Sequence, residues 1–355
     1  MATTLAARRT KGSRAPVTSF ELLFDLVYVF AITQVSHTLL ASLTPEGALQ
    51  SLVLWLAVWL GWQYTCWFTN WFNPDNPKVR LTLAVTMLAA LVMAVALPKA
   101  FADQGLVFAV AYAGMQVSRA AVAVWLMQPD DPLRDNYRRI LGWSGIAAVL
   151  WIAGAFAVGP LRLVLWILAI ACEQGAPAFG FWLPGLGRSR TSDWTIDGGH
   201  LAERCQLVVI VALGEAIMMT GAPLAADGLG HVPEFIAFTV AFVGSITLWW
   251  VYFDTGSARV SHAIESAADP GRIGSLYHYL HALLVGGIIV AAVGNDLTIA
   301  HPDQRVQAPA AAVLIGGAAA YVLGNGLLKR IAFGRFPLSH VVGLRSFRCS
   351  GRSPS

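Results

Sequence analysis

The chain has 355 residues, of which 56% are apolar and only 12% are charged. A soluble globular protein carries about 25% charged residues, so this composition excludes a soluble protein of this size. The formal net charge is only +4, and the lipid bilayer, not a nucleic acid, is the partner that the composition predicts.

Ten apolar stretches, each long enough to cross a hydrocarbon core, follow one another along the chain. They are predicted over residues 20–43, 48–72, 79–98, 104–127, 140–158, 161–183, 201–221, 234–253, 277–297 and 309–328. Segments rich in proline, glycine and asparagine separate them, and Gly159 with Pro160 predicts a very tight hairpin. The predicted fold class is therefore all-α, a polytopic transmembrane bundle of about ten helices.

The distribution of Lys and Arg predicts the orientation of the chain. Twenty of the 24 fall in segments on the side of the N-terminus and three fall on the opposite side, while Arg119 lies inside the fourth stretch. Cytoplasmic loops carry such an excess of basic residues. We therefore expect both termini in the cytoplasm and the protein in the bacterial inner membrane.

Three segments are expected along the chain. Residues 1–17 form a basic cytoplasmic arm without a cleaved signal peptide, residues 18–335 form one transmembrane domain, and residues 336–355 form a basic, Ser-rich tail. The basic ends are interpreted as contacts to anionic lipids rather than to nucleic acid. Their residues are Arg8, Arg9, Lys11, Arg14, Arg345, Arg348 and Arg352.

A weak internal repeat relates the two halves of the transmembrane domain, residues 20–98 and 201–297. DLVYVFAITQ, from Asp25, aligns without gaps with QLVVIVALGE, which ends at Glu215. Repeated helices that contain polar breaks are typical of transporters.

Two acidic residues, Glu21 and Asp25, lie one helical turn apart in the first apolar stretch, FELLFDLVYVFAITQVSH. Thr18 to Glu21 has the spacing of a capping box, which explains Glu21 as a helix cap. Asp25 lies deeper, where an ionisable group costs about 2.5–3.5 kcal/mol on insertion scales and usually faces a partner or a polar cavity. We therefore expect Asp25 to have a pairing or functional role.

Other charged residues are predicted to share the cytoplasmic leaflet with this pair. The members of this candidate polar cavity are Glu21, Asp25, Arg119, His200, Glu203, Arg204, Asp254, His278 and His281. Asp25, Arg119 and Glu203 are expected to lie deeper than the rest. The alternative interpretation is that these residues only tie helices together.

Polar residues also occur further into the apolar stretches. Glu215 lies on the same predicted helix face as Arg204, about 16 Å along the axis, which suggests a path of charged groups. The alternative is that Glu215 is a buried residue that only supports packing. Glu173 lies near the middle of the sixth stretch, four residues before Pro177. A stripe of tryptophans in the second stretch is interpreted as packing plus an interfacial belt: Trp55, Trp59, Trp62, Trp67 and Trp71.

Three motifs in this order, FELLFDLVYVFAITQVSH, HLAERCQLVVIVALGEAI and LYHYLHALLVGGIIVAAVGND, resemble the bacterial low temperature requirement A (LtrA) membrane protein family. The resemblance covers roughly residues 18–335. The family motif positions that it implies are Glu21, Phe24, Asp25, Gln34, His37, Arg119, His200, Glu203, Arg204, Gly214, Glu215 and His281. The family name describes a growth phenotype in the cold and implies no reaction.

Transport of a small solute or ion, with a proton as a candidate coupling ion, is the leading functional hypothesis. The carboxylates of Asp25, Glu203 and Glu215 are predicted to carry the charge, with Arg119 and Arg204 as counter-ions and His281 as a proton relay.

Two alternatives stay open. The first is a membrane-embedded enzyme acting on lipids or lipid-linked substrates. Its candidate metal ligands have suitable side-chain chemistry, although their spacing matches no metal motif. They are His200, His281, Asp25, Glu203 and Asp254. The second is a non-catalytic scaffold or sensor. The sequence identifies no cofactor and no oligomeric state.

Overall fold

The computed structural model describes residues 7–9, 16–227, 232–254, 267–300, 302, 304–334, 336 and 340. Over these residues the chain forms ten α-helices and two short 3-10 helices, without a strand. This all-helical architecture confirms the predicted fold class. Of the predicted arm and tail, residues 1–6, 10–15, 337–339 and 341–355 lie outside the described residues.

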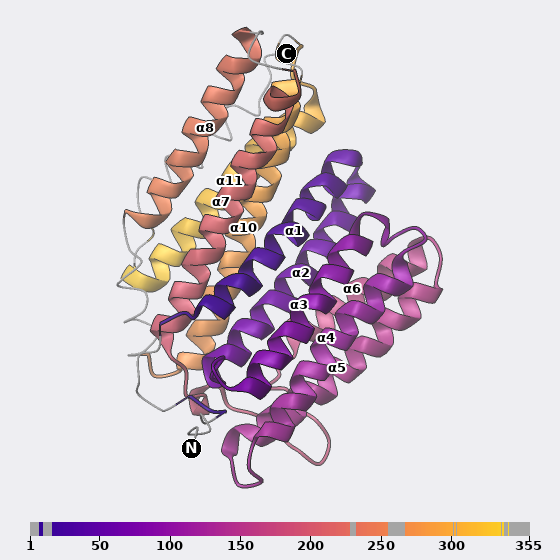
Figure 1. Ribbon diagram of the computed structural model, residues 1–355, viewed down its shortest axis with the longest axis vertical. Coiled ribbons are helices and arrows are strands. Elements are labelled where there is room, and N and C mark those ends of the chain that lie inside the picture. Colours follow the sequence, from indigo (N-terminus) through magenta and orange to yellow (C-terminus); the bar gives the residue numbers. More distant parts are fainter. Residues whose placement is uncertain are drawn as a thin grey trace. The chain divides into compact units, whose positions relative to one another are not determined.

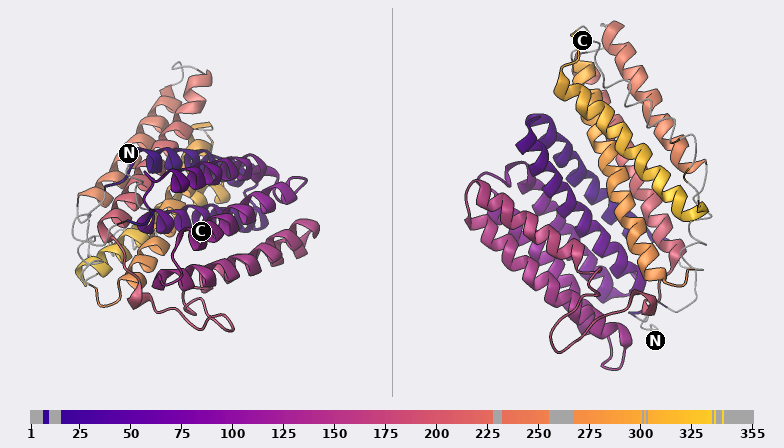
Figure 2. Two further views of the ribbon diagram at one scale, coloured as in Figure 1. Left: turned by 60° about the horizontal axis from the view of Figure 1, so that its bottom comes forward. Right: turned by 180° about the vertical axis from the view of Figure 1, so that it is seen from behind.

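Figures 1 and 2 show the helices as long rods joined by short connections. In chain order they are α1 (Ser19–Ala41), α2 (Pro45–Trp71), α3 (Pro77–Ala96), η1 (Leu97–Lys99), α4 (Gly105–Leu126), α5 (Pro132–Phe156), α6 (Pro160–Gly175), η2 (Thr191–Asp193), α7 (Gly198–Asp227), α8 (Val232–Phe253), α10 (Pro270–Ala300) and α11 (Ala308–Phe333).

Four predicted helix bounds differ clearly from those of the structure: the start of α5 (Pro132 rather than 140), the end of α7 (Asp227 rather than 221), the end of α6 and the start of α10. Helix α6 ends at Gly175 rather than near residue 183, because Pro177 follows and Gly180 and Phe181 have positive φ angles, which no helix allows. Helix α10 begins at Pro270, well before the predicted residue 277, because polar positions at the start of a helix do not register as an apolar stretch.

Eight helices of the described chain are long and apolar enough to cross a membrane, and α2 and α6 are not among them. Helix α6 has only 16 residues. Helix α2 has 27 residues but carries glutamine, threonine, asparagine and five tryptophans, which lower its hydropathy. The chain is therefore a multi-pass membrane protein with eight candidate spans, while ten crossings and the side of each terminus stay predictions.

The chain divides into two compact units, and each is described by itself. Unit 1 comprises Met1–Val35, Leu49–Arg204 and Ala267–Ile273, and unit 2 comprises Ser36–Ala48, Cys205–Ser266 and Gly274–Ser355. Unit 1 thus holds most of α1 and α2, all of α3 to α6 and the first turns of α7. Unit 2 holds the rest of α7 with α8, most of α10, and α11. The predicted single domain and its internal repeat stay predictions.

In unit 1, helices α3 to α6 form consecutive antiparallel hairpins, in which α3 packs against α4, α4 against α5 and α5 against α6 (Figure 1). Helix α2 is the most deeply buried helix of unit 1. Almost every residue from Val53 to Phe72 is shielded from solvent. A helix buried all round needs packing partners on every side. Because of this position, side chains of α2 contact buried polar side chains from the other helices of unit 1.

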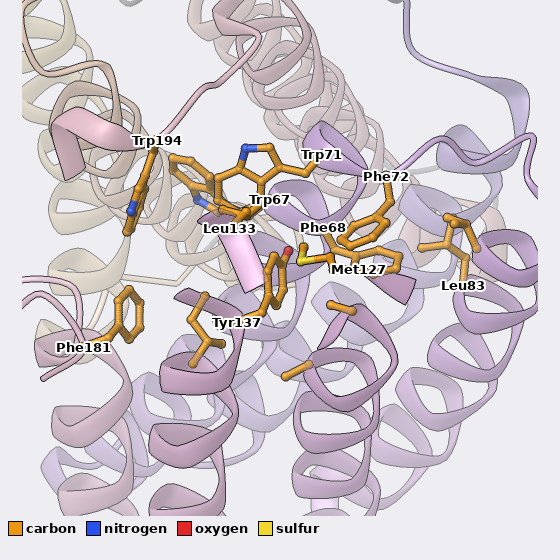
Figure 3. Packing of buried hydrophobic residues seen from close by; sticks show 14 of the residues in the cluster. Trp67, Phe68, Trp71, Phe72, Leu83, Met127, Leu133, Tyr137, Phe181 and Trp194 are labelled. Carbon is orange, nitrogen blue, oxygen red and sulfur yellow. The ribbon is translucent and has the colours of Figure 1, made fainter. Parts of the chain in front are cut away.

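Aromatic side chains fill the core of unit 1 at the end of α2 (Figure 3). Trp67 and Trp71 pack edge-on against Trp194, with ring centroids 5.5 and 6.0 Å apart, and Phe68 stacks on Phe72. Such aromatic pairs contribute about 0.5–1.5 kcal/mol each beyond their buried area. The tryptophan stripe predicted for this stretch therefore serves packing, as expected.

Proline, asparagine and aspartate set the helix starts of unit 1 where the sequence predicts breaks. The side chain of Asn76 accepts hydrogen bonds from the amides of Lys78 and Val79, and that of Asp131 accepts one from Leu133. Gly159, with a φ of 57°, makes the turn that leads directly into Pro160 at the start of α6. The predicted tight hairpin is confirmed.

Arg162 joins the loop ends at the opposite end of these hairpins. Its buried guanidinium donates to the carbonyl oxygens of Ala100 (3.0 Å), Ala102 (2.8 Å), Ala155 (3.3 Å) and Ala157 (3.1 Å). These carbonyls lie at or beyond helix ends and have no helical partner of their own. This arginine thus holds three chain segments together.

In unit 2, α10 and α11 approach closely because glycines face each other. A Cβ atom added to Gly287 would lie 2.7 Å from the backbone nitrogen of Tyr321, and one added to Gly317 would overlap the backbone of Ala291. Small residues that let two backbones approach are typical of helix contacts in membranes.

Candidate functional site

The site begins at the N-terminus of α1, where Thr18 and Glu21 form the predicted capping box. Glu21 Oε2 accepts from the backbone amide and the hydroxyl of Thr18, both at 2.9 Å, and the amide of Glu21 donates to Thr18 Oγ1 at 3.3 Å. The cap fixes the Glu21 carboxylate at the first turn of the helix.

The same carboxylate binds three basic or imidazole groups from distant parts of unit 1. Glu21 Oε1 lies 2.8 Å from His200 Nε2 and 3.2 Å from Arg204 Nη1, and Glu21 Oε2 lies 3.3 Å from Arg9 Nη2. Glu21 is completely buried. The capping interpretation and the pairing interpretation of Glu21 are therefore both correct.

Asp25, one turn further along α1, pairs with the other arm of the Arg204 guanidinium. Its Oδ1 atom lies 2.5 Å from Arg204 Nη2 and accepts a hydrogen bond from Trp62 Nε1 at 2.8 Å. Both side chains of the pair are buried. Arg204 thus bridges the two carboxylates of α1, which confirms the predicted pairing of Asp25.

Neutral side chains of α2 complete this network. Thr69 Oγ1 accepts from Arg204 Nη1 at 3.4 Å, and Asn70 Nδ2 lies 3.2 Å from His200 Nδ1. Asn70 also exchanges hydrogen bonds with the backbone of Asp197, whose carboxylate caps α7 by accepting from the amide of His200. The end of α2 therefore positions the start of α7 and with it both of its site residues.

We call Arg9, Glu21, Asp25, His200 and Arg204 the acid–base cluster. The contacts of Asn70 make His200 Nδ1 an acceptor, so the ring proton lies on Nε2 and is donated to Glu21. A neutral His200 leaves two arginines against two carboxylates, and the cluster is balanced in charge. Within the described residues, however, Asp25 Oδ2 and Arg204 Nε are buried without a hydrogen-bond partner.

Arg119 lies in a separate polar network of unit 1. It donates to Thr65 Oγ1 at 2.8 Å, to the carbonyl of Gly61 at 3.4 Å, and to Gln116 Oε1. Among the described residues, no carboxylate lies within ion-pair distance of it, so the predicted direct counter-ion role of Arg119 is not seen. Gln116 instead connects Arg119 to Glu173, because its Nε2 atom lies 3.3 Å from Glu173 Oε1.

Glu203 does not lie deep in the protein, contrary to the expectation. Its side chain is exposed at the start of α7, about 100° around the helix from the buried Arg204, and accepts from the backbone amide of Val17 at 3.3 Å. Neighbouring helix positions point in different directions, and the buried face carries His200 and Arg204.

The predicted residues of unit 2 are Glu215, Asp254, His278 and His281, and all of them except Asp254 are buried. His281 Nε2 lies 2.7 Å from the hydroxyl of Tyr252, and its Nδ1 atom lies 2.8 Å from the carbonyl of Tyr277. Because a carbonyl only accepts, Nδ1 carries a proton, whereas the Tyr252 hydroxyl is able to donate to Nε2 or to accept from it. Asp254, at the end of α8, is exposed.

The basic arm contacts protein acids at the positions that the structure describes. Arg8 Nη1 lies 3.0 Å from Asp131 Oδ2, and Arg9 reaches the carboxylate of Glu21. These two arginines thus pair with carboxylates of the protein, and contacts of the basic ends to anionic lipids stay a prediction. Lys11, Arg14, Arg345, Arg348 and Arg352 lie outside the described residues.

Sequence reasoning missed the neutral partners of the site. Trp62, Thr65, Thr69 and Asn70 all come from α2, and Gln116 from α4. A signal existed, because Gly61, Thr65 and Thr69 repeat at every fourth position of an otherwise bulky helix and so share one face. No group of three or more His, Cys, Asp or Glu side chains could hold a metal in the part of the chain that the structure describes.

Comparison with known proteins agrees with this arrangement of motifs. The family described as bacterial low temperature requirement A protein matches residues 16–348. An uncharacterized protein of Rhizobium meliloti (strain 1021) is 37% identical over 330 residues, which cover 91% of this chain and 80% of that relative. The family match, over residues 16–348, includes all three motifs that carry the resemblance. The chain therefore belongs to the bacterial low temperature requirement A (LtrA) family.

Proposed function

We propose that this LtrA protein transports a small solute or ion across the bacterial inner membrane and that the acid–base cluster takes part in the transport. The observation that carries the proposal is the incomplete hydrogen bonding of Asp25 and Arg204. Both are buried in unit 1, yet Asp25 Oδ2 and Arg204 Nε have no partner among the described residues. Such atoms are rare in folded proteins and offer a contact to a bound ion or solute.

The energetics of buried charge support a functional role. Taking a charged group out of water into a protein interior costs several kcal/mol even after the surroundings relax. A buried ion pair is often no more stabilising than apolar residues of the same volume. Four buried charged side chains therefore stabilise the fold no better than apolar residues would. A role in transport explains why the protein contains them.

A line of polar groups along α2 supports a path beyond the cluster. Gly61, Thr65 and Thr69 lie on one face of this helix and span about 12 Å of its axis. The carbonyl of Gly61 and the hydroxyl of Thr65 accept from Arg119, and the hydroxyl of Thr69 accepts from Arg204. One uncharged helix thus contacts both buried arginines of unit 1.

One observation favours the scaffold as a second candidate. Glu21 is saturated, because it closes the capping box of α1 and also contacts Arg9, His200 and Arg204. A carboxylate with this many partners holds helix ends together whatever else it does. If the protein is a scaffold, the acid–base cluster contributes only to the stability of the fold.

Transport is tested in proteoliposomes. The purified protein is reconstituted, and uptake of a panel of inorganic ions, amino acids and organic acids is followed under an imposed pH gradient. We expect uptake of at least one solute above that of empty liposomes, and its loss in Asp25→Asn. Trp62→Phe keeps both charges of the pair and removes one hydrogen bond to Asp25, so we expect a folded protein with altered uptake.

The matched control is Asp75→Asn, which breaks the exposed ion pair that Asp75 forms with Arg80 at 3.0 Å. This variant should transport like the wild type. Wild-type liposomes that take up nothing, or Asp25→Asn liposomes with undiminished uptake, contradict transport by this cluster. A strongly lowered melting temperature of Asp25→Asn without any wild-type flux favours the scaffold.

A further inference from the structure

A third buried carboxylate of unit 1, Glu173 of α6, lies without a direct cationic partner among the described residues. It accepts from Tyr112 (2.8 Å), Trp151 (3.2 Å) and Gln116 (3.3 Å), all neutral donors. Within the described part of the chain, no Lys, Arg or His nitrogen lies within 4 Å of it. A buried carboxylate held by neutral donors alone is a group whose charge is easily lost.

Gln116 links this carboxylate to Arg119. A guanidinium can only donate, so the Gln116 oxygen must face Arg119 and its amide nitrogen must face Glu173 and the hydroxyl of Tyr112. The amide orientation therefore fits an ionised Glu173, which accepts. It does not fit a protonated Glu173 that donates to Gln116.

Proton binding at Glu173 changes this geometry. The carboxylate takes up one proton and becomes a neutral acid, and its new O–H group needs an acceptor. If Gln116 turns its oxygen toward that group, its amide nitrogen faces Arg119, and two donors oppose each other. Arg119 then keeps only its partners on α2, the hydroxyl of Thr65 and the carbonyl of Gly61.

We propose that Glu173 is a proton-binding site in unit 1, and that Gln116 transmits its protonation state to Arg119 and thereby to α2. The inference deepens the proposed transport by naming a proton as one of the bound species, and it rests on that function only for its physiological purpose. Proton binding itself is an equilibrium property that needs no flux.

The other titratable groups around Glu173 come from α2, α4 and α6. Tyr64 of α2 donates to the backbone carbonyl of Glu173 at 3.4 Å, Tyr112 and Arg119 come from α4, and Cys172 is its neighbour on α6. Helix α5 contributes Trp151, which does not titrate. Glu173 is the one carboxyl in this set, so its signal is distinct from the others.

The test uses infrared difference spectroscopy of the full chain in lipid bilayers between about pH 5 and about pH 9, the range in which buried carboxyls titrate. We expect a C=O band of a protonated carboxyl that disappears as the pH rises and is absent in Glu173→Gln. Glu46→Gln, which removes an exposed glutamate at the start of α2, is the matched control and should retain the band.

Tyr112→Phe gives a second, independent readout. It removes one hydrogen-bond donor to the carboxylate, so the midpoint of the band should move by about one pH unit toward higher pH, a tenfold change in proton affinity. In Gln116→Met, the guanidinium bands of Arg119 should lose their dependence on pH while the carboxyl band persists.

The outcomes separate the two proposals. A pH-dependent band that is unchanged in Glu173→Gln overturns proton binding at Glu173, whatever the liposomes transport. If Glu173→Gln does not fold, an unmoved midpoint in Tyr112→Phe overturns it instead. If Glu173 titrates but the liposomes take up no solute, proton binding at Glu173 stands and the proposed transport is contradicted.

Discussion

Asn70 fixes the tautomer of His200. Its oxygen accepts from the backbone amide of Asp197 at 3.0 Å, so its amide nitrogen must face His200 Nδ1, 3.2 Å away. The ring proton is left on Nε2, which points at Glu21. A neutral side chain of α2 therefore sets the proton position of the cluster, as carboxylates and carbonyls do for metal-bound histidines.

Replacing Asn70 with Leu should release His200 and leave buried polar groups without partners. Each such group costs about 1–3 kcal/mol, so we expect a clearly lower melting temperature. Nitrogen-15 NMR should show the His200 ring protonated at Nε2 alone in the wild type and a mixture of tautomers in Asn70→Leu. Asn73→Ala, which removes a hydrogen bond in an exposed turn, is the control and should change neither property. A wild-type His200 that is already a mixture contradicts the assignment.

Replacing Arg204 with Met should destabilise the protein by about 3–5 kcal/mol, because Asp25 is then buried without its counter-ion. Adding Asp25→Asn should recover most of that loss, since the remaining Glu21 still has Arg9 and His200. Chemical unfolding of the two single variants and the double variant measures the coupling energy. Strict additivity of the two substitutions would contradict the pairing. Transport predicts in addition that the stable double variant is inactive.

Two adjacent glycines of α11 should respond oppositely to the same substitution. Gly317→Ala places a methyl group against the backbone of Ala291, and such overpacking costs about 1–3 kcal/mol. A Cβ atom on Gly316 meets nothing within 4 Å, so Gly316→Ala should be neutral or gain up to about 1 kcal/mol from helix propensity. The two melting temperatures compare the sites directly. Equal effects would show that α10 and α11 do not pack through Gly317.

The helices could be predicted from the sequence because each is a long apolar run that ends at a proline, glycine or asparagine. The bounds failed where the pattern is not apolar, at the polar start of α10 and after Gly175 of α6. Hydropathy alone also does not identify α2 as a span. Its burial arises from packing against neighbours, which a window over one stretch does not contain.

The charged members of the site could be predicted because a charge is conspicuous in an apolar stretch. The depth of Glu203 was wrong because it depends on which helix face meets a neighbour, and one position separates it from the buried Arg204. The partners Asn70 and Gln116 were missed since amides occur in many roles. Their significance follows from contacts 130 and 57 positions away in the chain, which local pattern does not reveal.

Arg204 follows Glu21 by 183 positions and Asp25 by 179. Ribosomes add about 5–20 residues per second, so roughly 10–35 s pass between synthesis of the two acids and synthesis of their shared counter-ion. During that interval α1 must reside in the membrane with its carboxyls neutral or tended by the insertion machinery. A chain that stops before α7 never acquires Arg204, so its Asp25 lacks the counter-ion that it has in the folded protein.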